Sequence, residues 1–373
     1  MQIIHFKTED RKNRTAFIQF PFKLYQDNPH WVPPIRMGIR KIFKPEYPFY
    51  AYGDAAFFLA KNNNGEVTGR LAVANNYRYN EFHHSKTALF YYFEVENDLQ
   101  TAESLFSAGF NWAKGQGLNH IMGPKGFTVL DGFGMLIKGF EYQPAFGQPY
   151  NMPYYPDLMD SLGFTKVTDV FTGKIEPPFN LPEKVTRASR LVRKRLGLHS
   201  PLFRSKKELR RNFQKIKNLY NESLAGPAGN PLISDEDFNA MASQLMWIAD
   251  PRLVKLLFKN EDAIGWLMAY PEIGSAIQKT KGRLFPFGWL HILRESKRTT
   301  RINLNGYGIV EDFQRMGGTA ILFDELYKSA TEINRYNYVE ALQFREENVK
   351  SLLEVANFDI DFHKTHRLYE IFI

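Results

Sequence analysis

Apolar residues recur with the periods of strands and helices, and this pattern occurs twice along the chain. Residues 65–76 and 261–272 each read as a turn and a strand with an early glycine, Gly69 or Gly265. Residues 154–175 and 347–373 each read as a short helix, a phenylalanine, a turn and a closing strand. The two ordered matches are spaced alike, with 95 positions from Gly69 to Phe164 and 93 from Gly265 to Phe358. We therefore predict two copies of one fold.

The second copy predicts its elements most clearly. A strand at 202–205 precedes helices that begin after the N-cap residues Ser205 and Ser234, and Glu208 completes a capping box. The predicted elements that follow are a hairpin at 252–271 that turns at 260–262, a strand at 301–310, a helix at 318–334, a strand at 336–344, and the closing helix and strand. In the first copy, residues 89–97, 99–117 and 118–123 match the strand, helix and strand around position 317.

A proline-rich stretch at 174–185 marks the boundary between the copies. We predict an N-terminal domain at 1–180, a basic linker at 181–205 and a C-terminal domain at 206–373. Both domains are expected to be α/β (α+β), each with a mixed, mostly antiparallel sheet flanked by helices.

Composition narrows the class of protein. The 373 residues are 44% hydrophobic and 15% aromatic, which argues against disorder. The absence of cysteine excludes disulfides, thiolate metal sites and a cysteine nucleophile. The N-terminus becomes charged within a few residues, and no apolar run approaches the ~18 residues of a membrane span. The histidines lack metal-ligand spacing, so we expect no metal and a cytoplasmic protein.

The net charge of +8 is concentrated in one segment, because residues 184–211 hold eleven Lys or Arg and a single acid, Glu208. Three interpretations stay open. The segment is a solvated helix exterior, it contacts nucleic acid, or it contacts anionic lipid at the inner membrane surface. The lipid interpretation places its apolar residues along one face, namely Val185, Ala188, Leu191, Val192 and Leu196.

A glycine pair opens the helix predicted at 318–334, within the stretch EDFQRMGGTAILFDEL (311–326). One interpretation is a helix start without a ligand, and the other is a cradle for the diphosphate of a nucleotide cofactor. The first copy has no glycine at the corresponding place. The cradle interpretation therefore assigns cofactor binding to the second copy alone.

The element order, with a Gln/Arg-x-x-Gly-x-Gly/Ala loop between the fourth strand and the third helix, resembles the GNAT superfamily of acyl-CoA N-acyltransferases. The resemblance covers both halves, and GYGIVEDFQRMGGTA (306–320) carries it most specifically. Further stretches, including GRLFPFG (282–288), resemble a group of tandem bacterial GNAT-like proteins of poorly defined function. Thr319 departs from the pattern in the frame of Gln314 and Gly317, whereas the frame of Arg315, Gly318 and Ala320 fits it.

The resemblance implies the following site for acetyl-CoA or a longer acyl-CoA. The cofactor-binding residues would be Ile309, Val310, Gln314, Arg315, Met316, Gly317, Gly318, Thr319 and Asn348. In the family a backbone N–H at the end of the fourth strand polarises the thioester, which indicates Ile309 and Val310. Asn348 is equally well explained as a helix N-cap. Where the family places a tyrosine that protonates the thiolate, this chain has Leu353, which puts that general acid in doubt.

A carboxylate is the expected general base, and Glu340 is the first candidate, followed by Glu311 and Glu94. For each of the three, the alternative interpretation is a solvated or salt-bridged acid, and this alternative is favoured over catalysis for any single one. The acceptor would bind at an aromatic cluster made by Tyr150, Asn151, Tyr154 and Tyr155, together with the glycine-rich loop 123–134. The same cluster could instead be packed core.

We therefore expect transfer of an acyl group from a CoA thioester to an amine, either lipidic or aromatic. One alternative is an aminoacyl-tRNA-dependent transferase of the tandem GNAT type, although the helical arm that some of these carry is not evident and nucleic acid is disfavoured as a partner. The other is a non-catalytic CoA-binding or scaffold protein.

Overall fold

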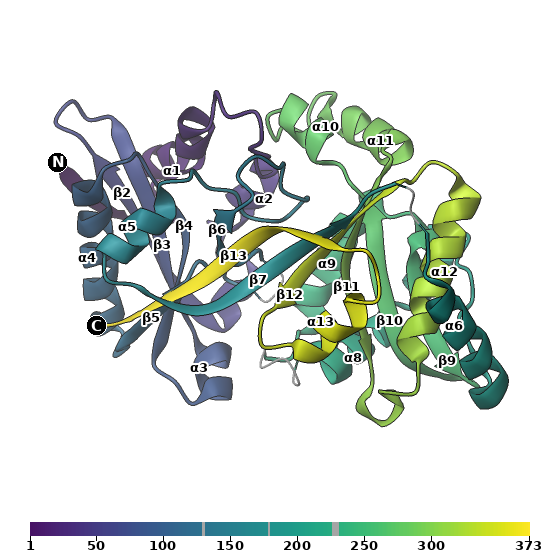
Figure 1. The fold of residues 1–373 in the computed structure, drawn as a ribbon. Helices are drawn as coiled ribbons and strands as arrows, with labels where there is room; N and C mark the ends of the chain where they lie inside the picture. Colours follow the sequence, from purple (N-terminus) through teal and green to yellow (C-terminus); the bar gives the residue numbers. More distant parts are fainter. Residues whose placement is uncertain (129–130, 178–179, 226–230) are drawn as a thin grey trace. The chain divides into compact units, whose positions relative to one another are not determined.

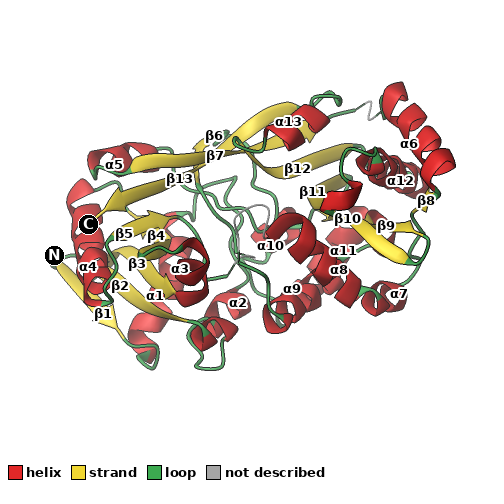
Figure 2. Ribbon diagram, turned by 90° about the horizontal axis from the view of Figure 1, so that it is seen from below, coloured by secondary structure: helices red, strands yellow, loops and turns green. Residues whose placement is uncertain are grey.

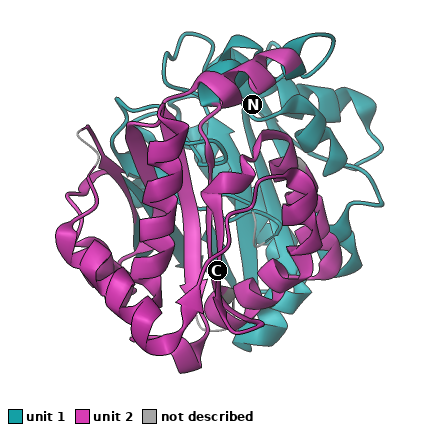
Figure 3. Cartoon of the chain, turned by 90° about the vertical axis from the view of Figure 1, so that its right-hand side faces the viewer, with its two compact units in different colours: residues 1–170, 274–289, 364–373 teal, residues 171–273, 290–363 magenta. Residues whose placement is uncertain are grey.

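The computed structural model describes residues 1–128, 131–177, 180–225 and 231–373. Positions 129–130 of the loop 123–134, and 178–179 of the predicted boundary, lie outside the described residues. The chain forms two compact units, shown in Figure 3. Unit 1 comprises residues 1–170, 274–289 and 364–373, and unit 2 comprises residues 171–273 and 290–363.

Unit 1 is an α/β layer structure whose elements are labelled in Figure 1. Its strands are β1 (Gln2–Phe6), β2 (Gly53–Lys61), β3 (Val67–Asn76), β4 (Thr87–Val95), β5 (His120–Gly123), β6 (Met135–Lys138) and parts of β7 (Thr165–Ile175) and β13 (Asp361–Phe372). Its helices are α1 (Arg11–Leu24), α2 (Arg36–Lys41), η1 (Pro48–Ala51), α3 (Tyr77–His83), α4 (Leu99–Gly115), α5 (Tyr155–Ser161) and α10 (Gly274–Lys279).

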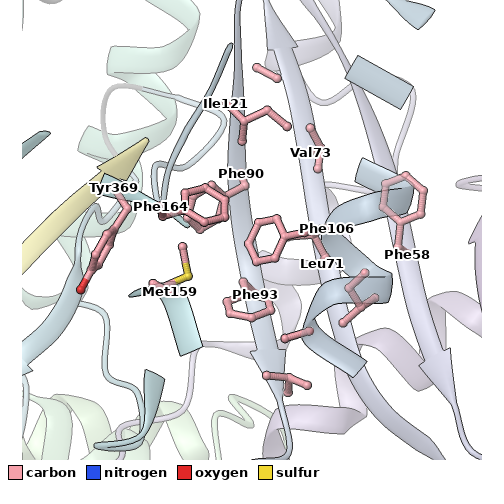
Figure 4. Close-up of a cluster of buried hydrophobic side chains, with 14 of the residues drawn as sticks. Phe58, Leu71, Val73, Phe90, Phe93, Phe106, Ile121, Met159, Phe164 and Tyr369 are labelled. Atoms are coloured by element: carbon pink, nitrogen blue, oxygen red, sulfur yellow. The ribbon is translucent and has the colours of Figure 1, made fainter. Parts of the chain in front are cut away.

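The sheet of unit 1 is antiparallel from β1 to β4, β4 and β5 are parallel, and β13 is antiparallel to β5. Successive residues of β3 point to opposite faces and enter different cores. Leu71 and Val73 join a cluster with α4 and α5, whereas Ala72 and Ala74 join one with α1, α2 and η1. Figure 2 shows the strands of the sheet together with helices α1, α2, α4 and α5. In the first cluster the rings of Phe90 and Phe106 meet edge to face, with 5.2 Å between the ring centroids. Figure 4 shows both rings.

Unit 2 repeats this arrangement. Its strands are β8 (Leu198–His199), β9 (Val254–Lys259), β10 (Asp262–Pro271), β11 (Arg301–Ile309), β12 (Tyr338–Arg345) and the remaining parts of β7 and β13. Its helices are α6 (Glu183–Leu196), α7 (Lys206–Arg211), α8 (Phe213–Tyr220), η2 (Asn221–Ala225), α9 (Asp235–Ile248), η3 (Pro251–Leu253), most of α11 (Gly288–Arg298), η4 (Glu311–Phe313), α12 (Gly318–Ile333) and α13 (Val349–Val355).

The predicted α/β (α+β) class, with a mostly antiparallel sheet flanked by helices, is confirmed. The predicted N-caps are also present, since Ser205 accepts the N–H of Glu208 and Ser234 accepts that of Asp237. The strand predicted at 202–205 is wrong, and β8 pairs with β9 instead. Phe203 is buried there, so its apolar character reflects packing without a strand ladder.

The two units are interleaved in sequence, whereas the predicted domain ranges are contiguous. Strand β7 gives residues 165–170 to unit 1 and 171–175 to unit 2, and β13 gives 361–363 to unit 2 and 364–372 to unit 1. The last residues of the chain therefore complete the sheet of unit 1. Hydropathy at 361–373 predicts a strand and cannot indicate which sheet receives it. Within the described ranges, no helix combines the length and the apolar character needed to cross a bilayer.

A bidentate ion pair fastens the end of the chain to unit 1. Arg367 donates to both carboxylate oxygens of Asp169, at 2.8 and 3.0 Å, and Lys166 lies 3.0 Å from the same carboxylate. Burial tends to raise the pKa of Asp169, but the hydrogen bonds from Arg367 and Lys166 outweigh it and lower that pKa. A carboxyl with a lowered pKa stabilises the fold above its unfolded pKa of about 3.9, and this stabilisation is lost as pH falls.

We expect Arg367→Ala to reduce the free energy of unfolding by about 1–3 kcal/mol at neutral pH, because a charge-assisted pair is lost. The difference between variant and wild type should shrink as pH falls below about 3.9 and through the lowered pKa of Asp169, because protonation removes the charge that Arg367 pairs with. Urea unfolding across pH measures both effects, and Arg298→Ala on exposed surface is the control. A deficit that does not depend on pH would contradict this role of the ion pair.

Candidate functional site

Strands β11 and β12 pair over only four residues of unit 2. Their parallel ladder runs from Arg301 and Tyr338 to Leu304 and Ala341, and both strands continue beyond it. The pairing of β11 with β10 shifts at the same place, so Asn305 forms a bulge. The two strands therefore diverge after Leu304, which leaves the β12-facing side of residues 305–309 without a ladder partner in β12.

The backbone of β11 presents donors on this side. The N–H of Val310 donates to the carbonyl of Ile264 at 3.0 Å. Because bonded pairs alternate along an antiparallel ladder, the N–H groups of Ile309 and Tyr307 face away from β10, toward β12. The expectation that Val310 offers its N–H to a ligand is thus corrected, because β10 holds this donor, whereas that of Ile309 faces the divergence.

The predicted cradle follows β11 directly. Gln314 donates its side-chain N–H to the carbonyl of Ile309 at 3.0 Å. Arg315 and Gly317 both have positive φ, 62° and 81°, and Gly317 is the N-cap of α12. At Gly318 a Cβ would lie 2.7 Å from Cδ1 of Ile309 and 2.8 Å from Cδ2 of Leu257, so any larger residue there would have to displace these side chains. The turn aims the start of a 16-residue helix outward, where its first N–H groups have no intrahelical partner.

Positive charge and exposed side chains surround the cradle. Arg315 and Met316 are exposed, and Thr319 is half-buried. The ammonium of Lys350 donates to the side-chain oxygen of Gln314 at 2.5 Å. Asn348 caps α13 by accepting the N–H of Ser351 at 3.1 Å, which matches the alternative interpretation of this residue. Its role toward a cofactor stays a prediction.

The basic helix α6 packs on the cradle helix α12. Ser189 is buried and donates to Asp324 at 2.6 Å, and Arg193 pairs with Glu325 at 2.7 Å. A Cβ on Gly317 would lie 2.7 Å from Val192. Part of the apolar stripe proposed to face lipid is therefore used inside unit 2, because Val185 is buried and Val192 packs on the core.

A row of buried polar residues crosses the sheet where the strands diverge. Tyr270 on β10 pairs in register with Asn303 on β11, and Asn303 pairs with Glu340 on β12. Asn303 donates to Glu272, and Nε2 of His363 lies 3.3 Å from Oε1 of Glu340. All five side chains are at least nine-tenths buried. Burial, then the charges of Glu272 and Glu340, raises the pKa of Tyr270, so its hydroxyl keeps its proton.

Unit 1 has the same backbone row with apolar side chains. The equivalent positions follow from the matching pairs Gly69–Val95 and Gly265–Ile309, and from the equal lengths of β4 and β11. Ala74 pairs with Leu89, and Leu89 pairs with Met122, at the positions of Tyr270, Asn303 and Glu340. Leu89 and Met122 form a small apolar cluster with Leu368. The polar row is therefore a property of unit 2 and is not required by the fold.

Unit 1 also fills its own divergence. The N–H of Val95, equivalent to that of Ile309, donates to the hydroxyl of Tyr155 at 2.8 Å. The carbonyl of Val95 accepts the hydroxyl of Tyr154 at 2.6 Å. The N–H of Lys125 donates to the carbonyl of Phe90 at 2.9 Å, and Phe127 from the same loop is buried against Phe49. These contacts occupy backbone groups of β4. The equivalent groups of β11 in unit 2 are the ones that would face a ligand in the proposed site.

The residues predicted to bind the acceptor are thus engaged within unit 1. Asn151 is buried and bonds both the N–H and the carbonyl of Leu136, at 2.7 and 3.0 Å. Tyr150 donates to the carbonyl of Phe140 at 3.0 Å. These contacts match the packed-core alternative, which also accounts for Tyr154 and Tyr155. An acceptor-binding role for the four residues stays a prediction without support from their contacts.

The three candidate bases have different surroundings. Glu94 accepts from Arg70 at 2.6 Å, and Arg70 is fully buried under Phe17, so Glu94 is its counter-ion. Glu311 is exposed after β11. Glu340 is buried beside His363, at the divergence. Sequence reasoning missed His363, Asn303, Glu272 and Tyr270, although comparing RINL in the second copy with TALF in the first shows the polar exchange at Asn303.

Sequence reasoning also missed Tyr307. This residue lies near Leu353, the position where the family places the tyrosine that donates a proton to the thiolate. Its hydroxyl donates to Glu354 at 3.1 Å, next to Leu353 on α13. Burial, followed by the charge of Glu354, raises the pKa of Tyr307. Beneath it, an apolar cavity of about 30 Å³ lies among α12, α13 and the sheet, bordered by Leu304, Phe323 and Phe358.

We expect Tyr155→Phe to reduce the free energy of unfolding by about 1–3 kcal/mol, because the buried N–H of Val95 loses its acceptor. Tyr154→Phe should cost less, since the carbonyl of Val95 keeps the hydroxyl of Tyr155 at 3.1 Å. Urea unfolding measures both variants. Unchanged stability combined with a raised KM for an acceptor amine would instead support the predicted substrate-binding role.

Two curated bacterial proteins are similar to the chain over nearly its whole length. The first, "Protein YghO" of Escherichia coli (strain K12), is 24% identical over 367 residues, which is 97% of this chain and 93% of the relative. The second, "Bacterial ceramide synthase" of Caulobacter vibrioides, is 25% identical over 382 residues, which is 99% of this chain and 97% of the relative. No protein-family model matches the chain.

Solved structures with similar folds also cover the whole chain. A tandem GNAT protein from the clavulanic acid biosynthesis pathway superposes with a TM-score of 0.56 at 9% identity, covering 100% of this chain and 98% of that one. A GCN5-related N-acetyltransferase from Sphaerobacter thermophilus gives 0.51 at 11% identity, with coverages of 99% and 95%. At these identities the likeness shows the fold alone. The predicted resemblance is thereby confirmed at the level of architecture, and this chain has the tandem GNAT fold.

Proposed function

We propose that unit 2 is an acyl-CoA-dependent N-acyltransferase site and that unit 1 is its degenerate copy. One observation carries the proposal. Two units with matching strand pairs differ at the point of divergence. There unit 1 is apolar and closed by its own loop, whereas unit 2 has the buried register pair Asn303–Glu340 beside strand backbone that β12 does not pair with. Buried polar groups reduce stability unless they are satisfied, so their retention in one copy indicates a function.

The cradle supplies what a CoA diphosphate requires. Backbone N–H groups of the first turn of α12 act as donors, and the helix dipole favours negative charge there. The guanidinium of Arg315 and the ammonium of Lys350 add positive charge from both sides of the loop. Gly317 and Gly318 let the ligand approach the main chain.

The length of β11 matches the reach of a pantetheine arm. About twelve bonds separate the diphosphate oxygen from the thioester sulfur, the length of about four extended residues. Four residues back from Ile309 is Asn305, the bulge at the divergence. We therefore infer that the N–H groups of Ile309 and Tyr307 meet the amides of the arm and that the thioester lies near Asn305, next to Asn303 and Glu340.

The polar row provides for proton transfer. The acceptor ammonium must lose one proton before its nitrogen attacks the acyl carbon. The nitrogen loses a second proton as the carbon–sulfur bond breaks, and the departing thiolate gains one. In our proposal Glu340 accepts a proton from the amine, while His363 holds its carboxylate in place. Tyr307, which stays protonated, replaces the missing tyrosine of α13 as the proton donor to sulfur.

We propose a lipidic amine as the acceptor. The support comes from the relative named as a bacterial ceramide synthase, because a ceramide is an amide of a long-chain amine. That relative aligns with 99% of this chain, so the alignment includes both units and the cradle. Acetyl and longer acyl groups are both compatible with this site, and the chain length of the donor is left to measurement.

Isothermal calorimetry should detect CoA binding to the wild-type protein. We expect Gly318→Val to abolish binding, because a side chain there displaces Ile309 and Leu257. Arg315→Ala with Lys350→Ala should weaken binding about tenfold through the loss of charged donors. The matched control is Gly115→Ala in unit 1, where a Cβ has open space. No binding by the wild type would refute the proposal, and unaltered binding by both cradle variants would misplace the site.

We expect Glu340→Gln to lower kcat at least about 100-fold with little change in the KM of the acyl-CoA, since the substitution removes a base and keeps the shape. His363→Asn should lower kcat about tenfold by letting Glu340 move. Steady-state assays with a long-chain amine and acyl-CoAs of increasing length measure kcat and KM for both variants. Glu332→Gln, at an exposed position, is the control. A larger loss in Glu311→Gln than in Glu340→Gln would assign the base to Glu311.

A further inference from the structure

Unit 1 exposes two large aromatic side chains that are separated by a single proline in the sequence. Phe285 is 68% exposed and Phe287 is 67% exposed, in the segment Lys281–Trp289 that follows α10. This segment contains the whole stretch GRLFPFG (282–288). Monomeric proteins rarely expose neighbouring apolar side chains to this extent without a binding partner.

The segment is held firmly by unit 1. The N–H of Arg36, the first residue of α2, donates to the carbonyl of Gly282 at 3.0 Å, and Nε of Arg36 donates to the carbonyl of Lys281 at 3.0 Å. At the other end the indole of Trp289 donates to the carbonyl of Pro286 at 3.0 Å. The tip is therefore a fixed loop, so ordering it against a partner costs little conformational entropy.

Three arginines gather at the base of this loop. Arg36 and Arg40 lie four residues apart on α2, and the N–H of Arg36 donates to Gly282, the residue before Arg283. Burial, then the charges of Arg283 and Arg40, lowers the pKa of Arg36. Arg36 bonds Gln19 at 2.9 Å and lies over the ring of Phe22. Within the described part of the chain none of these arginines forms an ion pair. Met37 on α2 is also 46% exposed.

Aromatic side chains that project beyond a cluster of unpaired cations are typical of surfaces that meet the headgroup region of a membrane. Each cation near an anionic leaflet adds attraction, and apolar side chains add insertion. The exposed face of α6 is less suited, because its large exposed apolar side chains are aliphatic, Leu191 and Leu196, and Val185 and Val192 on its other side are packed inside unit 2.

We propose that the segment Lys281–Trp289 and the start of α2 form a docking surface for an anionic phospholipid bilayer. Phe285 and Phe287 enter the interface, and Arg36, Arg40 and Arg283 contact lipid phosphates. This surface belongs to unit 1 and does not depend on acyl transfer in unit 2, so its test stands apart from the test of catalysis.

The test is flotation of the full-length protein with vesicles of phosphatidylcholine alone and of phosphatidylcholine mixed with phosphatidylglycerol. We expect binding to the mixed vesicles, weakened at least about tenfold in the double variant F285S/F287S. Phe82→Ser is the matched control, because Phe82 is 42% exposed on α3 of the same unit, and it should bind as the wild type does. Both variants replace exposed side chains, and equal melting temperatures confirm that they fold.

Charge variants distinguish this surface from α6. R40Q/R283Q should weaken binding to the mixed vesicles, and adding F285S/F287S to that variant should weaken it little further. R187Q/R190Q on α6 should bind nearly as the wild type does. The proposal is overturned if wild type ignores mixed vesicles, if F285S/F287S binds normally, or if only the α6 variant loses binding. A change of oligomeric state in F285S/F287S, measured by sedimentation, would overturn it in favour of a contact between two copies.

Discussion

The separation of β11 from β12 after four paired residues is the constraint on which the proposed site depends. Strand backbone carries a donor and an acceptor at every residue, and these groups need partners when they leave a ladder. Beyond Leu304 the N–H groups of Tyr307 and Ile309 face the side that β12 has left. An extended ligand with its own amides can pair there as a strand would, which is the logic of adding a strand to a sheet. The bulge at Asn305 and the glycine turn at 317–318 set the two ends of that stretch.

The two units provide an internal comparison that a single domain would not. Both keep the glycine-containing third strand, the bulge in the fourth strand and a parallel fifth strand. Unit 1 then bonds Val95 with Tyr154 and Tyr155 and fills its divergence with a loop that carries Phe127. In unit 2 the corresponding backbone has no ladder partner in β12, and the row beside it is polar. In our proposal, one fold is thus used once as a packed support and once as a site.

The position of α6 links the basic linker to the cradle. Val192 lies over Gly317, while Ser189 and Arg193 bond α12. The charge run predicted as a linker is therefore partly a structural helix of unit 2. Two of the apolar residues that made it resemble a lipid-binding helix, Val185 and Val192, are committed to packing, whereas Leu191 and Leu196 stay exposed. The exposed aromatics that fit a membrane lie elsewhere, in a segment that composition did not single out.

Local sequence determined much of this protein. Periodicity and N-cap residues predicted most helices and strands, the repeat spacing predicted two copies, and the glycine pair located the turn before α12, because each depends on residues close in the chain. The interleaved units, the row from Tyr270 to His363 and the occupied N–H of Val310 were decided only by tertiary structure. These features depend on strand register and on which sheet receives the last strand, and both are set by packing between residues up to hundreds of positions apart. The sequence therefore located the glycine turn that we propose as a cradle, and the fold decided which side chains surround it.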